Sequence, residues 1–179
     1  MVRTDEMAGK YVTLKSAALE DALFTSKLRA DEQLIKFVHK VDCTLEGQMK
    51  YIQSQREKPD DFYFIIRSLR GESLGTIALY HINDGSGELG RWLSYGNAAE
   101  NLESVMLLHD MAYEELGLDM VYTCTDNDNE RVKNFWKHFG GDECFVEELP
   151  DLTVSKNIIK KSTYSELIRP RIADMLRYK

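Results

Sequence analysis

Residues 73–125 contain the arrangement that most restricts how this chain can fold. The runs SLGTIALYHIN (73–83) and GELGRWLS (87–94) surround the sequence DGSG, which is typical of a tight β-hairpin turn. A helix predicted over Leu102–Leu116, closed by Gly117, and a β-branched strand, MVYTCT (120–125), follow directly. A strand, a helix and a strand in succession predict a right-handed crossover between parallel strands. The sheet is therefore expected to be mixed.

Shorter segments extend this unit on both sides. Hydrophobic periodicity and turn residues predict, in chain order, a strand at 10–14, a helix over 17–37, a helix over 44–58, a strand at 61–69, a short helix within 126–141, late strands at 144–149 and 163–168, and a helical tail at 169–179. In the second helix Thr44 is the expected N-cap, and Leu45, Met49 and Ile52 share one face. The order indicates one α/β domain over residues 1–179, with terminal extensions at 1–9 and 169–179.

Charge and composition exclude several classes of protein. The net charge of −7 leaves no surplus of Lys and Arg for nucleic-acid phosphates. No apolar run approaches the length of a membrane span and no secretory signal is visible, so we expect a cytoplasmic protein that does not contact a membrane. The three cysteines and four histidines are too widely spaced for a disulfide framework or a metal site, and Cys124 is expected in the core.

The ordered set of motifs resembles the GNAT superfamily of acyl-CoA N-acyltransferases. The resemblance runs from about residue 10 to residue 168. The opening GKYVTLKSAALEDA and the strand GRWLS are similar to the ribosomal-protein N-terminal acetyltransferase branch, and NERVKNFWKHFGG is similar to the family's second coenzyme motif. Residues 28–66 also resemble the flagellin-sugar enzymes, which acetylate the amine of a nucleotide-linked amino sugar. The resemblance implies a mixed, splayed central sheet with helices on both faces.

The same resemblance implies that acetyl-CoA is the co-substrate and that no metal takes part. Backbone N–H groups at the start of the helix after YGNAAEN would hold the coenzyme pyrophosphate. Alignment places Ala98, Ala99, Glu100 and Asn101, followed by Leu102, where the family has Gln or Arg, Gly, any residue and Gly. Alanine disfavours the left-handed conformation, and Glu100 would repel a pyrophosphate unless it points to solvent. An ordinary loop with Asn101 as helix N-cap is the alternative.

Three further elements would complete the coenzyme site. Backbone groups of Trp92, Leu93 and Ser94 would bind the pantetheine arm like an added strand, although Trp92 and Leu93 suit a plain core strand equally well. Asn129 matches a coenzyme-contacting asparagine of the family, or it is the N-cap of the helix that follows. Trp136 stands where the family often has a tyrosine. An indole cannot act as a general acid, so Trp136 would only pack against the thioester end.

Amine acylation also needs a base, because an alkyl amine is mostly protonated at neutral pH. Glu88, on the strand leading to the coenzyme site, is the first candidate, and His81 across the hairpin is the second. Strand alternation predicts that Glu88, Gly90, Trp92 and Ser94 share a face. The alternative is that Glu88 is only a solvated residue. Tyr164 is a candidate proton donor, whereas His109 and Tyr113 are expected to be packing residues.

We therefore expect an acetyl-CoA-dependent N-acetyltransferase acting on a primary amine, which is either a small molecule or a peptide. The acceptor pocket would be built by the two N-terminal helices and the late hairpin. A nucleotide-linked amino sugar is slightly preferred over a protein N-terminus. A homodimer is left open. The altered loop and the missing tyrosine leave one alternative, a non-catalytic GNAT-fold protein that works as a binding or interaction module.

Overall fold

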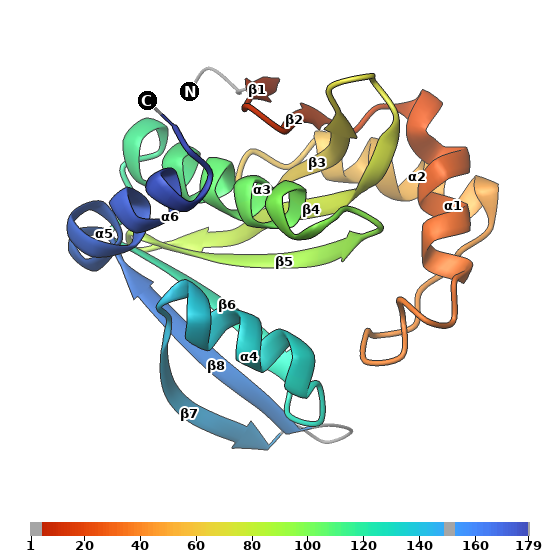
Figure 1. Ribbon diagram of the computed structural model, residues 1–179. Helices are drawn as coiled ribbons and strands as arrows, with labels where there is room; N and C mark the ends of the chain where they lie inside the picture. Colours follow the sequence, from red (N-terminus) through yellow and green to blue (C-terminus); the bar gives the residue numbers. More distant parts are fainter. Residues whose placement is uncertain (1–4, 149–152, 179) are drawn as a thin grey trace.

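A computed structural model of the chain describes residues 5–148 and 153–178, and of residues 143–145 only the backbone. Leu149, at the end of a predicted strand, and residues 1–4 and 179 of the predicted extensions lie outside the described residues. The described strands form one sheet in the order β1-β2-β3-β4-β5-β6-β8-β7 (Figure 1). Their bounds are β1 Glu6–Ala8, β2 Val12–Ser16, β3 Phe62–Ser68, β4 Ser73–Asn83, β5 Ser86–Ser94, β6 Met120–Asp126, β7 Asp142–Glu148 and β8 Thr153–Lys160.

Neighbouring strands are antiparallel except β5 and β6, which are parallel as the crossover predicts. These two strands share only three register pairs, Ser86 with Met120, Gly87 with Val121 and Glu88 with Tyr122. Beyond Glu88 they run apart, β5 staying with β4 and β6 with β8 (Figure 1). The sheet is thus mixed and splayed, and its opening lies at its centre.

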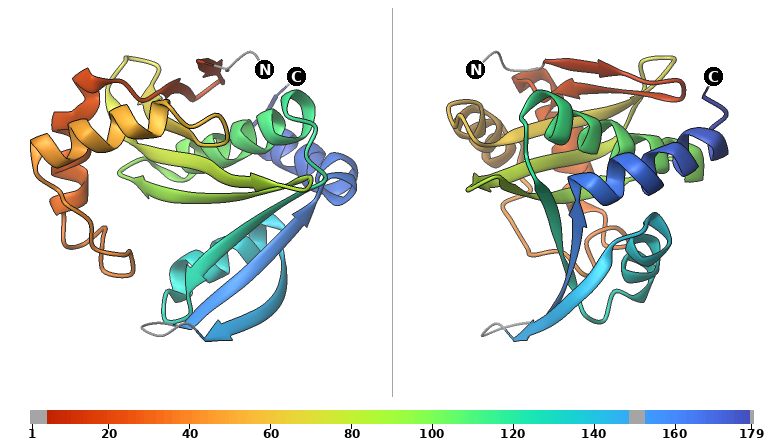
Figure 2. Two further views of the ribbon diagram at one scale, coloured as in Figure 1. Left: turned by 180° about the vertical axis from the view of Figure 1, so that it is seen from behind. Right: turned by 90° about the vertical axis from the view of Figure 1, so that its left-hand side faces the viewer.

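Helices cover both faces of the sheet, as the resemblance implies (Figures 1 and 2). Their bounds are α1 Ala22–Ala30, α2 Leu45–Arg56, α3 Ala98–Asp110, α4 Glu130–Phe139, α5 Lys161–Thr163 and α6 Arg169–Met175, with π-helical turns at Met111–Glu115 and Tyr164–Ile168. Alternation along β3 separates two buried clusters. Phe62, Phe64 and Ile66 face α3, whereas Tyr63 and Ile65 face α1 and α2.

The helix predicted over 17–37 is wrong beyond Ala30. Asp31 is extended at the end of α1, and its carboxylate accepts the N–H of Gln33 and the hydroxyl of Tyr95. Such local side-chain bonds compete with helix continuation. Residues 31–43 form instead an irregular connection (orange in Figures 1 and 2) on the side where β5 and β6 separate.

In the second helix, Thr44 is the N-cap as predicted, since its hydroxyl accepts the N–H of Gly47. The predicted apolar face is wrong. Ile52 is buried, but Leu45 and Met49 are 47% and 40% exposed. Gln48 and Gln55 are buried with Ile52, because their side-chain amides donate to the carbonyls of Asp42 and Asp61.

Of the predicted late hairpin only the first strand is confirmed, because β7 contains residues 144–148 of that strand. The strand after β7 is β8, Thr153–Lys160, which pairs with both β6 and β7. TYSELI (163–168) is helical, and it leads into α6, the predicted helical tail. Ile168, Ile172 and Leu176 are buried against the core beneath α3, so hydrophobic burial accounts for the helical state of this segment.

One buried carboxylate connects the two ends of the described chain. Glu103, on α3, is fully buried and accepts the backbone N–H groups of Lys10, Tyr11 and Val12 at 2.8, 2.6 and 2.7 Å. It also accepts the hydroxyl of Tyr178. A buried carboxylate is tolerated where several donors replace its water, and these donors come from the segments before β2 and after α6. No helix in residues 5–148 or 153–178 is both long and apolar enough to cross a membrane.

His109 and Tyr113 are both fully buried among aromatic rings. The prediction that they are packing residues is confirmed. Nδ1 of His109 lies 2.8 Å from the carbonyl of Val105, so that nitrogen carries the proton. Burial lowers the pKa of His109 from 6.5 to about 4. The carboxylate of the next residue, Asp110, is bound to Tyr164 and Arg169.

The buried His109 should make stability sensitive to acid. The unfolded chain takes up a proton near pH 6.5, whereas the folded chain does so only near pH 4. The stability contributed by the neutral ring is therefore present above pH 6.5 and is lost as the pH falls toward 4, by up to about 3 kcal/mol. We predict that His109→Asn loses less free energy of unfolding than the wild type between pH 7 and 4.5 in urea titrations. Equal losses in the two proteins would contradict the assignment.

Candidate functional site

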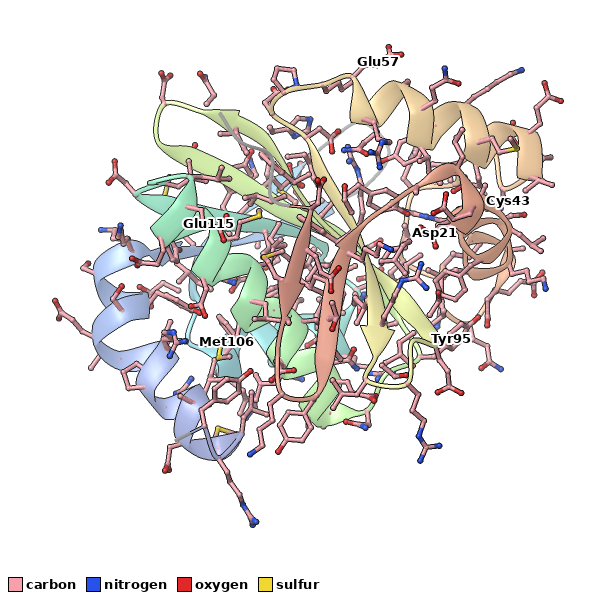
Figure 3. All side chains as sticks on the ribbon, turned by 90° about the horizontal axis from the view of Figure 1, so that it is seen from above. Asp21, Cys43, Glu57, Tyr95, Met106 and Glu115 are labelled. Carbon is pink, nitrogen blue, oxygen red and sulfur yellow. The ribbon has the colours of Figure 1, made fainter. Side chains whose placement is uncertain are left out.

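A cavity of about 710 Å³ occupies the opening between β5 and β6. Two groups of elements line it. One comprises the far end of β5, β6 and α4, and the other comprises the 31–43 connection, α1, α2 and Tyr80 on β4. The lining includes Arg29, Lys36, His39, Asp42, Tyr51, Tyr80, Arg91, Trp92, Leu93, Cys124, Asp126, Asn129 and Trp136. Figure 3 places Cys43 and Tyr95 on the side of α1 and α2, away from Met106 on α3 and Glu115 on the π-helical turn after it.

The α4 side of the cavity is aromatic. Trp136 is only 2% exposed and packs against Trp92, with ring centroids 5.9 Å apart, and against Phe135 and Phe139. Asn129 caps α4 by accepting the N–H of Val132, and it also lines the cavity. Its N-cap role is thus confirmed. This wall offers apolar contact area and no side chain that ionises near neutral pH.

Two bulges set the direction of side chains on the other side. A simple two-residue hairpin would pair His81 with Glu88, but His81 has a φ of 50° and the register shifts there, so Tyr80 pairs with Glu88 instead. A second shift accompanies Arg91, also at φ 50°. The predicted common face of Glu88, Gly90, Trp92 and Ser94 is therefore wrong. Trp92 packs with the α4 rings, while Arg91 stacks 4.0 Å from the Tyr80 ring centroid.

Glu88 stands at the point where β5 and β6 separate. Its side chain is 14% exposed, so it is not a freely solvated residue. Oε1 accepts the hydroxyl of Tyr80 at 2.9 Å, and Oε2 lies 3.0 Å from Nδ1 of His81, whose own side chain is 69% exposed. Burial, together with the charge of Glu88, raises the pKa of Tyr80, which keeps the phenol protonated. Tyr80 lines the cavity, whereas Glu88 is not among the lining residues and is linked to the cavity through the hydroxyl of Tyr80.

Cys124 was expected in the core, and this prediction is wrong. It is exposed on β6 and lines the cavity, because β5 no longer pairs with β6 at this point. Desolvation by the cavity walls and, secondly, the charge of Glu88 raise the pKa of its thiol to about 11. Cys124 is thus a neutral thiol at physiological pH.

Tyr164 is not in the cavity. It lies on the π-helical turn before α6, 2% exposed, and its hydroxyl donates to Asp110 at 2.7 Å and lies 3.0 Å from the carbonyl of Met106. Burial and then the charge of Asp110 raise its pKa. The prediction that Tyr164 sits on the last strand is wrong, and its hydroxyl is engaged in the core.

The loop after β5 caps its own helix. Asn97 Oδ1 accepts the N–H groups of Ala99 and Glu100 at 2.9 and 3.1 Å, and the Glu100 carboxylate accepts the N–H of Asn97 at 2.8 Å. Asn97 is therefore the N-cap, four residues before the Asn101 considered from the sequence, and α3 begins at Ala98. The side chain of Asn101 donates to the carbonyl of Gly96. In this capping box two of the amides at the helix start already have partners.

The remaining predicted residues lie at the edge of this loop or within the core. Ser94 accepts the N–H of Gly96, while Ala99 and Leu102 pack against the main core cluster. Leu93 is 5% exposed and lines the cavity. In the described parts of the chain, no group of three His, Cys, Asp or Glu side chains is arranged to hold a metal ion.

Sequence reasoning missed Tyr80, Arg91, Asp61 and Arg29. Arg91 donates to Asp61 at 2.6 Å while stacking on Tyr80. Burial opposes the charged form of Arg91, but Asp61, Tyr51 and Tyr80 more than compensate and raise its pKa. The turn sequence predicts that β4 and β5 pair near Glu88. It does not indicate the bulge at the left-handed His81, which makes Tyr80 the partner of Glu88.

Known structures share this architecture. FdhC, a nucleotide-linked sugar GNAT solved without ligand, aligns with a TM-score of 0.81 at 21% identity, over 96% of this chain and 98% of that one. Spermidine N-acetyltransferase from Vibrio cholerae, solved with CoA and spermine, gives 0.78 at 16% identity, over 88% and 100%. RimJ from Mycobacterium smegmatis, solved with CoA-disulfide, gives 0.78 at 14%, over 92% and 88%. At these identities the likeness shows the fold alone.

The search of curated proteins finds no match. The family comparison does find one. Residues 12–142 match the acetyltransferase (GNAT) domain, a stretch that runs from β2 to the start of β7 and includes the whole opening between β5 and β6. Because this match covers most of the chain, the protein is a member of the GNAT acetyltransferase family.

Proposed function

We propose that this protein transfers an acetyl group from acetyl-CoA to a primary amine. The observation that carries the proposal is one cavity that runs from α4, past Tyr80, to α2 and the 31–43 connection, with Glu88 bound to the hydroxyl of Tyr80. An acyl transferase needs a donor site and an acceptor site that meet at one carbonyl carbon. Of the acceptors considered, a nucleotide-linked amino sugar remains slightly preferred over a protein N-terminus.

The coenzyme would enter on the α4 side. Trp92, Leu93 and Ser94 lie on the part of β5 that has no partner strand on its inner edge, so a pantetheine arm can bind there through backbone hydrogen bonds. Trp136 and Asn129 would contact its thioester end. The pyrophosphate would approach the start of α3, where Ala99, Glu100, Asn101 and Leu102 lie. It would have to displace the side chains of Asn97 and Glu100 from the amides that they occupy.

The reaction joins the amine nitrogen to the thioester carbonyl carbon, and the bond from that carbon to sulfur breaks. Glu88 would accept the proton that the amine loses, either directly or through the hydroxyl of Tyr80, which already donates to it. His81 is the second candidate base. The coenzyme leaves as a thiolate, whose conjugate thiol has a pKa of about 8.5 by analogy with cysteine. It therefore needs no dedicated proton donor, and none of the roles above involves a metal.

The self-capped loop favours a second candidate function, a GNAT-fold module that binds a partner without catalysis. Glu100 places a negative charge at the expected phosphate position, and its capping box leaves fewer amides free than a glycine loop would. Trp136 likewise removes the tyrosine that the family often uses. Coenzyme binding separates the two functions.

Under the catalytic proposal, acetyl-CoA should raise the melting temperature of the protein. A ligand at about 100 times its dissociation constant stabilises the folded state by about 2.7 kcal/mol, which thermal denaturation detects easily. CoA without the acetyl group should act similarly, and ATP at the same concentration serves as the control for non-specific binding. No shift with either coenzyme at millimolar concentration would favour the non-catalytic function.

Removing the charge of Glu100 should strengthen coenzyme binding. Two like charges about 4 Å apart in water repel by about 1 kcal/mol, so we predict that Glu100→Gln tightens acetyl-CoA binding about fivefold in calorimetry. The glutamine can still accept the N–H of Asn97. The control is Glu46→Gln, which makes the same change of charge in the first turn of α2, at an exposed side chain. A weaker affinity in Glu100→Gln would show that the pyrophosphate does not bind at this helix start.

Glu88→Gln should lower turnover at neutral pH by roughly 10²–10⁴-fold, because the amine loses its proton acceptor. The defect should shrink at high pH, where more of the amine is already neutral. Coenzyme affinity should hardly change. Tyr80→Phe tests the relay, and it should reduce turnover as well if the proton passes through the phenol. Full activity in Glu88→Gln combined with an inactive His81→Ala would instead assign the base to His81.

A further inference from the structure

Arg29 differs from the other buried arginines of the α1 and α2 side. It lies in the last turn of α1, is 9% exposed and lines the cavity. Arg67 and Arg91 each form an ion pair at 2.6 Å, with Asp21 and Asp61. Within residues 5–148 and 153–178, no carboxylate lies within ion-pair distance of Arg29. Burying a guanidinium without a counter-ion is unfavourable, and the dipole of α1 compensates only part of that loss.

A buried hydroxyl group lies beside Arg29. The side chain of Tyr63 is fully buried, and its hydroxyl lies close to the side chains of Thr76 and Arg29 without a hydrogen bond of normal geometry to either. Burial raises the pKa of Tyr63, and the nearby charge of Arg29 partly offsets this. The ring of Tyr51, which packs edge-on against Tyr63 at 5.6 Å, feels the same charge and lines the cavity. A cation without a counter-ion thus lies on the acceptor side, in front of a fully buried phenol.

The other charges around this side of the cavity do not neutralise Arg29. Lys36, on the connection, adds positive charge to its wall. Two carboxylates also line the cavity, but neither lies within ion-pair distance of Arg29. Asp42 accepts the N–H and the hydroxyl of Thr44, and Asp126, at the end of β6, accepts the N–H of Asp128. The cavity wall opposite α4 is therefore suited to an anion, and it disfavours a polycation.

We propose that Arg29 binds an oxyanion of the acceptor, so that the amine acetylated here belongs to a molecule that also carries a carboxylate or a phosphate. This rests on the proposed function, and it narrows the substrate class. Arg29 supplies planar, charge-assisted donors that match either oxyanion. A polyamine such as spermidine is then a poor acceptor, because its second amine would face Arg29.

The kinetic test compares matched amines that differ only in the oxyanion. Glucosamine 6-phosphate is paired with glucosamine, and glycylglycine with glycylglycine amide, using release of the coenzyme thiol as the readout. In the wild type, kcat/KM should favour the charged member of at least one pair by about 10–100-fold, the range for a charged hydrogen-bonded pair. The pair that shows the effect identifies phosphate or carboxylate as the group bound.

In Arg29→Gln the preference should fall below about threefold, and Arg29→Lys should keep part of it. Arg70→Gln is the matched control, since Arg70 is exposed in the β3–β4 turn and its loss changes the net charge equally. The proposal would be overturned if Arg29→Gln kept the full preference for the acceptor that carries an oxyanion. It would also be overturned if the wild type preferred spermidine or the acceptors without an oxyanion.

Two readouts separate this proposal from the proposed function. Inorganic phosphate should bind to the CoA-saturated wild type at least tenfold more tightly than to CoA-saturated Arg29→Gln, whether or not any amine is acetylated. Equal affinities would refute the oxyanion site, whereas absent acetylation with retained phosphate binding would refute only the enzymatic proposal. The melting temperature of Arg29→Gln should equal or exceed that of the wild type, because an uncompensated buried charge is removed. A clear drop would instead assign Arg29 a structural role.

Discussion

The separation of β5 and β6 after three register pairs is the constraint on which the rest of this structure depends. Beyond Glu88, β5 has a neighbour only in β4, and β6 only in β8, so two rows of backbone groups face the opening. The parts of the sheet on either side are joined by polar bonds near the closed end. The hydroxyl of Tyr113 donates to Ile159 of β8 at 2.7 Å, and Lys161 donates to the carbonyl of Tyr113 at 2.6 Å. The opening thus forms at the centre of the sheet without loss of a continuous core.

The two bulges convert this opening into a site with different walls. His81 and Arg91 both adopt left-handed conformations, which are costly for residues other than glycine and are often found near functional sites. Each changes which side chains face the α1 and α2 side. Tyr80 is placed opposite Glu88, and Arg91 is turned onto Tyr80 and Asp61. One wall is consequently aromatic and uncharged, and the other is a network of hydroxyl, carboxylate and guanidinium groups.

The elements with strong local signals were predictable. The β4–β5 hairpin, the cap at Thr44 and the parallel crossover follow from turn chemistry, capping and chirality, and each was found. Local signals failed where tertiary contacts decide. Asp31 ends α1 because Tyr95, far along the chain, donates to it, and residues 163–168 are helical because Ile168 is buried near α3. Of the candidate site, the strand segment and Glu88 could be named as candidates from the sequence, but Tyr80 and Arg29 depend on a bulge and on burial that periodicity does not encode.

Glu103 has a consequence for how the chain reaches this structure. Its carboxylate is separated by 91 to 93 residues from the amides of Lys10, Tyr11 and Val12, and by 75 from Tyr178. While α3 is packed but these partners are absent, the core contains a charged group with neither water nor donors, which is highly unfavourable. Partly folded states with a dry core under α3 are therefore penalised. The carboxylate makes folding more cooperative, because the central helix can be fully desolvated only when the distant segments dock with it.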